Sequence, residues 1–259
     1  MPLQSPEVYI KKNIAAVQEY SILAGTAIAD IFTPPHYWAD VFTQMDSIGV
    51  GSMPIIVLTG FFTGCVLALQ SATALTEFGA ISMTGSLVSL SMVKELGPVL
   101  TGLMVSGRNA AGMASEIGSM KVTEQLDAMR ALGTDPVRKL VTPRIMATIF
   151  MLFFLTIIAD ALGIAGGALM SVSLLGLNAN TYLHDSYRGL VHGDIVQGLT
   201  KPLFSGFIIS TVGCYFGMKT TGGTQGVGRA TTQAVVVSSV AIIIVDLLVT
   251  RAMIGIFGS

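Results

Sequence analysis

Ionisable side chains inside long apolar stretches are the first residues in this sequence that could do chemistry. Lys94 and Glu95 interrupt one such stretch, and Asp160 and Asp246 lie inside two others. A charge at the centre of a membrane-spanning helix costs about 2.5–3.5 kcal/mol on insertion scales, so such residues are candidates for a functional site. For both aspartates, the structural alternative is a carboxylate that is satisfied by a neighbouring helix or reaches water.

A glycine-rich segment, residues 223–230, has the glycine spacing of a phosphate-binding loop. That motif requires a lysine that reaches the phosphates and a serine or threonine that holds magnesium, but Arg229 and Ala230 occupy these positions. We therefore expect a cytoplasmic turn here and no nucleotide binding by this segment. Cofactor and metal sites are not expected in this one, because its two cysteines lie in apolar runs and its three histidines lack ligand spacing.

The elements that position these residues must be membrane helices. The 259 residues are 52% hydrophobic and 11% charged, whereas soluble domains carry about 25% charged residues. The net charge is -1 and the cationic residues are scattered, which gives no electrostatic footprint for a nucleic acid. This composition predicts an all-α polytopic membrane protein.

Five segments are apolar and long enough to cross about 30 Å of hydrocarbon. They cover about 48–75, 83–106, 146–172, 195–218 and 233–257. The second is the weakest, because Lys94, Glu95 and Pro98 interrupt it. Small residues at four-residue spacing, Gly60 and Gly64 among them, would let helices approach closely. We expect residues 48–259 to form one transmembrane domain.

The N-terminal segment, residues 1–47, has the pattern of a helix that lies on the membrane surface. A helix packed on the flank of the protein itself is the alternative, and Pro34 and Pro35 end the segment. The predicted apolar face consists of Ile10, Ile14, Val17, Ala24, Ile28 and Ile31, and Lys11, Lys12, Glu19 and Asp30 lie away from it.

Cationic residues outside the spans predict the orientation. With five spans, residues 1–47, 119–144 and 219–232 share one side of the membrane. That side carries nine lysines and arginines, whereas the other carries only Arg188. The positive-inside rule therefore places the N-terminus in the cytoplasm and the C-terminus outside.

A short amphipathic helix is predicted at about 122–132, between the second and third spans. Val122, Leu126 and Met129 form its apolar stripe, and Gly133 and Pro136 end it. Such a helix could dock a soluble motor protein. Alternatively, it rests on the membrane surface or on its own bundle.

Several separated motifs appear in order along the chain. They are 94–99 (KELGPV), 106–112 (SGRNAAG), 114–120 (ASEIGSM), 123–129 (TEQLDAM), 133–136 (GTDP), 222–223 (GG) and 226–232 (GVGRATT). Together they resemble the MlaE-type permease family, the transmembrane subunits of ABC transporters that move lipids in Gram-negative envelopes and related organelles. The first position of the 94–99 motif is often arginine in that family, and Lys94 keeps the charge without the bidentate geometry.

The resemblance implies a homodimeric permease of the bacterial inner membrane with phospholipid as substrate. Its partners would be two cytoplasmic ABC ATPase subunits, a STAS-domain protein and a periplasmic hexamer of MCE-domain proteins. The transporter would exchange phospholipid with that periplasmic carrier and maintain outer-membrane lipid asymmetry. The helix at 122–132 would be the coupling helix, with Glu124 and Gln125 as its main contacts.

The substrate is expected in an outward-opening cavity at the dimer interface. Adjacent helix positions do not face each other, so Lys94 and Glu95 each need a different partner, and one of them would lie near the lipid headgroup. Apolar residues that would contact the acyl chains are Leu67, Leu75, Phe78 and Leu96. A purely structural salt bridge between helices is the alternative for the charged pair.

Two other functions remain compatible with the sequence. A secondary, ion-coupled transporter would also be polytopic with buried carboxylates, but would work without an ATPase. A structural membrane scaffold would lack a lipid-sized cavity.

Overall fold

The computed structural model describes residues 6–257, and every regular element in that range is helical. The elements are, in order, α1 (Pro6–Phe32), α2 (Trp38–Glu77), η1 (Ile81–Met83), α3 (Thr84–Ser91), η2 (Met92–Leu96), α4 (Gly97–Val105), η3 (Ser106–Ala110), α5 (Ala111–Val122), α6 (Gln125–Ala131), η4 (Val137–Val141), α7 (Thr142–Ser173), α8 (Ala179–Arg188), α9 (His192–Met218) and α10 (Gly223–Phe257).

Five helical segments among the described residues are long and apolar enough to cross a membrane, which confirms the predicted all-α polytopic class and the number of spans. They are Trp38–Glu77, Ile81–Val122, Val137–Ser173, His192–Met218 and Gly223–Gly255. Most extend beyond the predicted bounds, because helices continue past the apolar stretch into polar sequence. The first begins at Trp38 rather than near residue 48, and the last begins at Gly223, so the glycine-rich segment is helical and not the expected turn.

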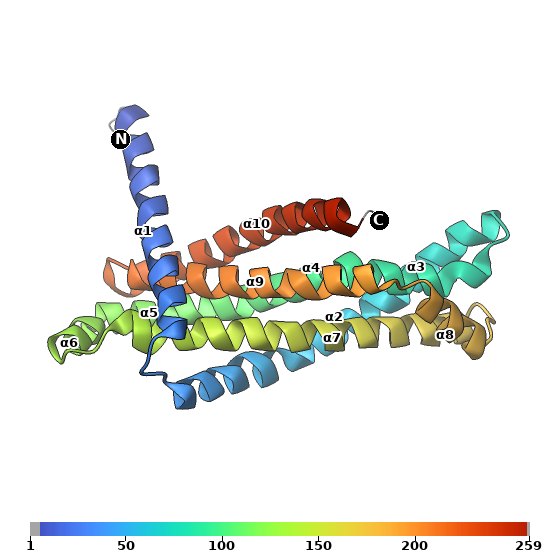
Figure 1. The fold of residues 1–259 in the computed structure, drawn as a ribbon, viewed down its shortest axis with the longest axis horizontal. Coiled ribbons are helices and arrows are strands. Elements are labelled where there is room, and N and C mark those ends of the chain that lie inside the picture. The colour runs from blue at the N-terminus through green and yellow to red at the C-terminus, as the bar shows by residue number, and fades with distance from the viewer. Residues whose placement is uncertain (1–5, 258–259) are drawn as a thin grey trace.

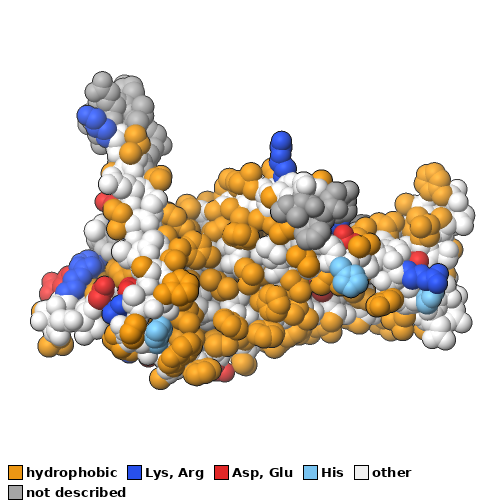
Figure 2. Space-filling view, in the orientation of Figure 1, with side chains coloured by type: hydrophobic (Ala, Val, Ile, Leu, Met, Phe, Trp, Pro, Cys, Tyr) orange, Lys and Arg blue, Asp and Glu red, His pale blue; other side chains and the backbone are white. Residues whose placement is uncertain are grey.

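The spans run side by side as one elongated bundle, with α6 at one end and α3 and α8 at the other (Figure 1). Hydrophobic side chains cover most of the middle of the face shown in Figure 2, whereas most charged side chains lie toward the ends. Such a surface, apolar over its middle and polar at its ends, fits a hydrocarbon slab between two aqueous layers.

Glycines allow a close contact between α2 and α7. A Cβ on Gly60 would lie 2.9 Å from the carbonyl oxygen of Ala159, and one on Gly64 would lie 1.8 Å from that of Gly163. The predicted role of the small residues at four-residue spacing is thus confirmed for this pair.

The second span is continuous despite its charges and its proline, contrary to the weakness expected from its sequence. It contains two π-helical segments, η2 and η3. In η2 the amide of Gly97 donates to the carbonyl of Met92 five residues earlier. Pro98, the second residue of α4, has no N–H to donate, and the carbonyl of Lys94 four residues before it accepts from Lys201 Nζ instead. Single-turn π segments of this kind are frequent at functional sites.

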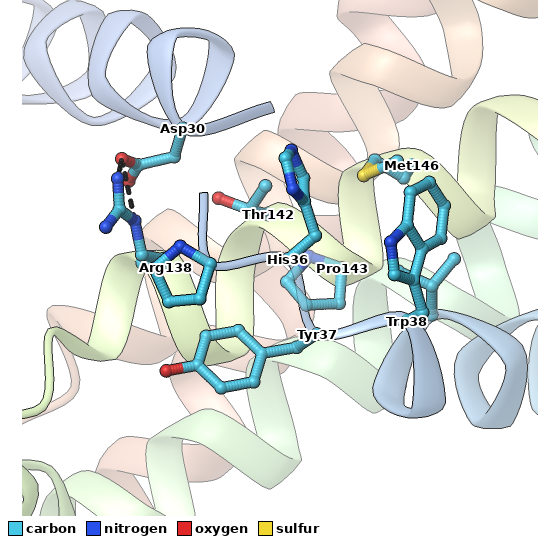
Figure 3. Close-up of a pocket in the computed structure, with 10 residues that line it drawn as sticks. Asp30, His36, Tyr37, Trp38, Arg138, Thr142, Pro143 and Met146 are labelled. Carbon is cyan, nitrogen blue, oxygen red and sulfur yellow. Dashed lines mark hydrogen bonds and ion pairs between the residues drawn. The ribbon is translucent and has the colours of Figure 1, made fainter. Parts of the chain in front are cut away.

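Helix α1 crosses the bundle near one end and projects beyond it (Figure 1). It is fixed there by Asp30, which pairs with Arg138 of η4 at 3.1 Å, as Figure 3 shows. The pocket between the end of α1 and the start of α2, lined by Tyr37 and Trp38, has a volume of only about 10 Å³. It therefore holds at most about one water molecule.

The predicted apolar face of α1 only partly matches the side that packs. Ala24 is buried and Ile31 packs against the bundle, but Ile14, Val17 and Ile28 are exposed. The side chains of Ile10 and Lys12 lie outside the described part of the chain. Exposed apolar residues on a helix that crosses the spans are consistent with contact to lipid.

Candidate functional site

The two charged residues of η2 point to different partners on neighbouring helices. Lys94 Nζ lies 2.9 Å from Asp194 Oδ1 at the start of α9. Glu95 Oε2 lies 2.5 Å from Nζ of Lys201, about two turns further along α9 than Asp194. The expectation that adjacent residues each need a separate partner is therefore met, and both partners come from another helix.

Lys201 is the centre of this group of charges. Its side chain is 2% exposed, and its Nζ donates to the carbonyl oxygen of Lys94 at 2.8 Å as well as to Glu95. It also lies 3.0 Å from Asp246 Oδ1 of α10. Thr250, one turn beyond Asp246, donates to Glu95 Oε1 at 3.2 Å. We call Lys94, Glu95, Asp194, Lys201 and Asp246 the intramembrane charge cluster.

Four cluster residues, Lys94, Glu95, Lys201 and Asp246, lie within the predicted spans, whereas Asp194 lies in the first turn of α9, next to the predicted start of its span. Lys201 is nine residues from the start of α9 at His192, which corresponds to roughly 14 Å at 1.5 Å per residue. Sequence reasoning identified Lys94, Glu95 and Asp246 but missed Lys201, Asp194 and Thr250. Lys201 could have been found from the sequence, because a cation inside a predicted span requires an anionic partner.

Asp160 of α7 does not join the cluster. Its carboxylate lies against Gly97, where a Cβ would come within 1.7 Å of Oδ1. Asp160 is buried, and its Oδ1 finds no hydrogen-bond partner among the described residues. The structure therefore does not show the alternative in which a neighbouring helix donates hydrogen bonds to this carboxylate oxygen.

A groove of about 340 Å³ opens beside η2 on the flank of α2. It brings together two of the four predicted acyl-chain contacts, Leu67 and Leu96, whereas Leu75 and Phe78 do not line it. Phe78 lies at the exposed end of α2. The groove is lined by Phe62, Thr63, Val66, Leu67, Gln70 and Leu96. A groove lined mainly by apolar side chains, with the polar Thr63 and Gln70 among them, could hold the chain of an amphiphile.

The predicted cytoplasmic helix is shorter than expected. Val122 belongs to the end of α5 and is exposed, and α6 starts only at Gln125. The reason is Glu124, whose backbone is left-handed with φ of 61° and interrupts the helix between them. Of the predicted stripe, Leu126 is buried in the core and Met129 is partly buried, while Glu124 and Gln125 are exposed.

Charges on α6 are organised around Asp127. Lys121 donates to its carboxylate at 2.9 Å and Arg130 at 3.1 Å. These contacts lower the pKa of Asp127 below its ordinary value, and the hydrogen bond from Lys121 contributes most. The pairing leaves Glu124 as the free carboxylate at the start of α6, without a salt bridge to any described residue. This end of the bundle therefore presents a short, charged helix to the solvent.

Metal chemistry has no support in the described part of the chain, where no group of histidine, cysteine or acidic residues could hold an ion. Both cysteines are free and buried.

Comparison with known proteins adds to this geometry. The family model for the permease MlaE matches residues 41–252. A probable ABC transporter permease protein of Rickettsia bellii is 45% identical over 236 residues, which cover 91% of each chain. The intermembrane phospholipid transport system permease protein MlaE of Haemophilus influenzae is 35% identical over 213 residues, 82% of each chain. The chloroplastic protein TRIGALACTOSYLDIACYLGLYCEROL 1 of Arabidopsis thaliana is 36% identical over 93% of this chain and 68% of its own.

Proposed function

Because the chain belongs to the MlaE permease family, whose members include ABC transporter permeases, we propose that it moves phospholipid across or out of the bacterial inner membrane with energy from a separate ATPase. One observation carries the substrate class: the mainly apolar groove lined by Leu67 and Leu96 includes the residue that directly follows Glu95 of the intramembrane charge cluster. An apolar trough and a group of charges at membrane depth match the two parts of a phospholipid.

The working unit in this proposal is a homodimer with two cytoplasmic ABC ATPase subunits, a STAS-domain protein and a periplasmic MCE-domain hexamer. The cavity lies at the dimer interface, and exchange of phospholipid with the periplasmic carrier maintains outer-membrane lipid asymmetry. The ATPases bind ATP and magnesium. Support for the ATPase contact is that Glu124 and Gln125 are exposed at the start of α6, while Leu126 is buried in the core.

The proposed orientation places α6 in the cytoplasm and α8 outside. The support is the distribution of cationic residues, because Lys121, Arg130, Arg138 and Lys139 all lie near α6. A cysteine introduced at the exposed Asn180 of α8 should react with a membrane-impermeant thiol reagent in intact cells. Labelling only after lysis would reverse the orientation.

Lipid capture and transport together test the function. A photoreactive residue at Leu96 should cross-link phospholipid in membranes, and trapping the ATPase with vanadate should change the yield. The matched position is Leu58, an exposed apolar residue of α2 outside the groove, whose labelling by bulk lipid should not respond to vanadate.

Reconstitution separates the proposal from its rival. Vesicles that contain the permease and its ATPase should transfer phospholipid only when ATP is hydrolysed. Transfer driven by an ion gradient without the ATPase would favour the secondary transporter. Lipid capture at other surfaces but never at Leu96 would remove the groove from the pathway.

A further inference from the structure

The intramembrane charge cluster carries an excess of negative charge. Two lysines, Lys94 and Lys201, face three carboxylates, those of Glu95, Asp194 and Asp246. Lys94 pairs with Asp194 alone, whereas Glu95 and Asp246 share Lys201. With every group in its usual ionised form, one negative charge is left without a counter-charge among these residues, at a depth where an isolated charge is costly.

Both lysines of the cluster already have partners within the protein. Lys201 has three N–H donors, and its Nζ already contacts the Lys94 carbonyl oxygen, Glu95 and Asp246. Its side chain is only 2% exposed, so a phosphate oxygen has little access to it. Lys94 is paired and 20% exposed.

Acceptor capacity remains, and it faces outward. The Glu95 side chain is 42% exposed, about twice as much as Lys94. Its carboxylate accepts from Lys201 and Thr250, whereas a carboxylate can accept about four hydrogen bonds. The Asp246 side chain is 17% exposed, although its Oδ1 is buried 3.0 Å from Lys201 Nζ. A ligand that supplies a positive charge and several N–H donors would satisfy both carboxylates.

We propose that Glu95 and Asp246 make this site selective for phospholipids with a primary ammonium headgroup, such as phosphatidylethanolamine, over anionic phospholipids. The ammonium binds between the two carboxylates, and the lipid phosphate lies toward Lys94. This selectivity rests on the proposed transport function and specifies its substrate. Because the interaction needs both charge and N–H donors, trimethylated headgroups bind less well than primary amines.

Competition between headgroups tests the selectivity. The assembled complex, with a photoreactive residue at Leu96, is placed in nanodiscs that contain equal amounts of phosphatidylethanolamine, phosphatidylcholine and phosphatidylglycerol. Mass spectrometry of the cross-linked lipid should show phosphatidylethanolamine enriched about tenfold over phosphatidylglycerol, the ratio expected from one charge-assisted hydrogen bond. Phosphatidylcholine should fall between them.

Removing one carboxylate charge should abolish the enrichment. Asp246→Asn keeps the shape and brings the cluster to neutrality, so capture should become nearly equal for the three lipids. Glu95→Gln is the second variant, used if Asp246→Asn does not fold. Glu77→Gln, at the exposed end of α2, is the matched control and should retain the wild-type preference.

Each outcome bears on a different claim. Lipid captured at Leu96 with equal headgroup proportions in the wild type would overturn the selectivity but leave the transport function standing, because the excess charge would then be balanced by a bound proton. An enrichment that persists unchanged in both folded variants would also overturn it. Absence of any lipid at Leu96, with capture elsewhere, would overturn the groove assignment and the selectivity together.

Discussion

Gly64 of α2 and Gly163 of α7 meet without a side chain between them. A Cβ added to Gly64 would lie 1.8 Å from the carbonyl oxygen of Gly163, which is backbone and cannot rotate away. The two helices can approach this closely only because both positions lack a side chain. This contact fixes the wall of the bundle on which the groove lies, since Leu67 follows Gly64 by one turn.

Gly64→Ala should therefore destabilise the protein by about 3 kcal/mol, at the upper end of the cost of overpacking a core. Thermal unfolding in detergent measures the effect. Gly112→Ala is the matched control, because no atom lies within 4 Å of the added Cβ and alanine favours a helix by up to about 1 kcal/mol. Equal melting temperatures for the two variants would show that α2 and α7 are not in the described contact.

The Lys94–Asp194 pair predicts strong non-additivity. Lys94→Met leaves the carboxylate of Asp194, whose side chain is 6% exposed, without its counter-charge, and loss of one partner of a buried pair costs about 3–5 kcal/mol. Adding Asp194→Asn should restore most of the stability, because asparagine can still accept from the Val191 amide as Asp194 does. Unfolding of both single variants and the double variant measures the coupling. Simply additive losses would mean that the pair does not form.

Glu124→Lys should weaken binding of the ATPase at least about tenfold, because a reversed charge at a complementary interface costs affinity. The permease itself should remain folded, since the side chain is exposed. Co-purification of the ATPase and its lipid-dependent hydrolysis are the measurements. Glu77→Lys makes the same change at the far end of the bundle and should have no effect. Full coupling in Glu124→Lys would remove α6 from the interface.

Tyr182 should make the protein sensitive to alkali. Burial raises the pKa of Tyr182 to about 12, whereas the unfolded chain loses this proton near pH 10. The folded state therefore loses stability as the pH rises from about 10 to 12, by up to about 3 kcal/mol. Tyr182→Phe lacks the ionisable group, so it should lose less stability over this range than the wild type, although loss of the hydroxyl's hydrogen bond to Ile164 costs about 1 kcal/mol at neutral pH.

Thermal unfolding at about pH 8 and pH 11 compares this variant with Tyr187→Phe. Tyr187 is 82% exposed and Tyr182 only 1%, so Tyr187→Phe should keep the alkaline sensitivity of the wild type. Identical pH profiles for Tyr182→Phe and the wild type would contradict the assignment.

Short-range features were predictable from the sequence. Gly133 ends the helix at α6 with φ of 77°, as its position before Pro136 indicated. The break between α5 and α6 after Val122 could not be predicted from the sequence. It is caused by Glu124, whose left-handed backbone is uncommon for a residue other than glycine. The π-helical segment Met92–Leu96 was not predicted either, because the sequence analysis assumed the 3.6 residues per turn of an α-helix.

By itself, the sequence determined that the described chain has five helices long and apolar enough to span a membrane, because the length and hydropathy of a segment are local properties of the sequence. It also required that Lys94 and Glu95 find separate partners, since adjacent helix positions diverge. Only the tertiary structure decided which partners these are. Asp194, Lys201 and Thr250 lie at least 100 positions further along the chain, and their meeting depends on how each helix is rotated about its axis by packing. The surplus of carboxylates around Lys201 follows from that packing.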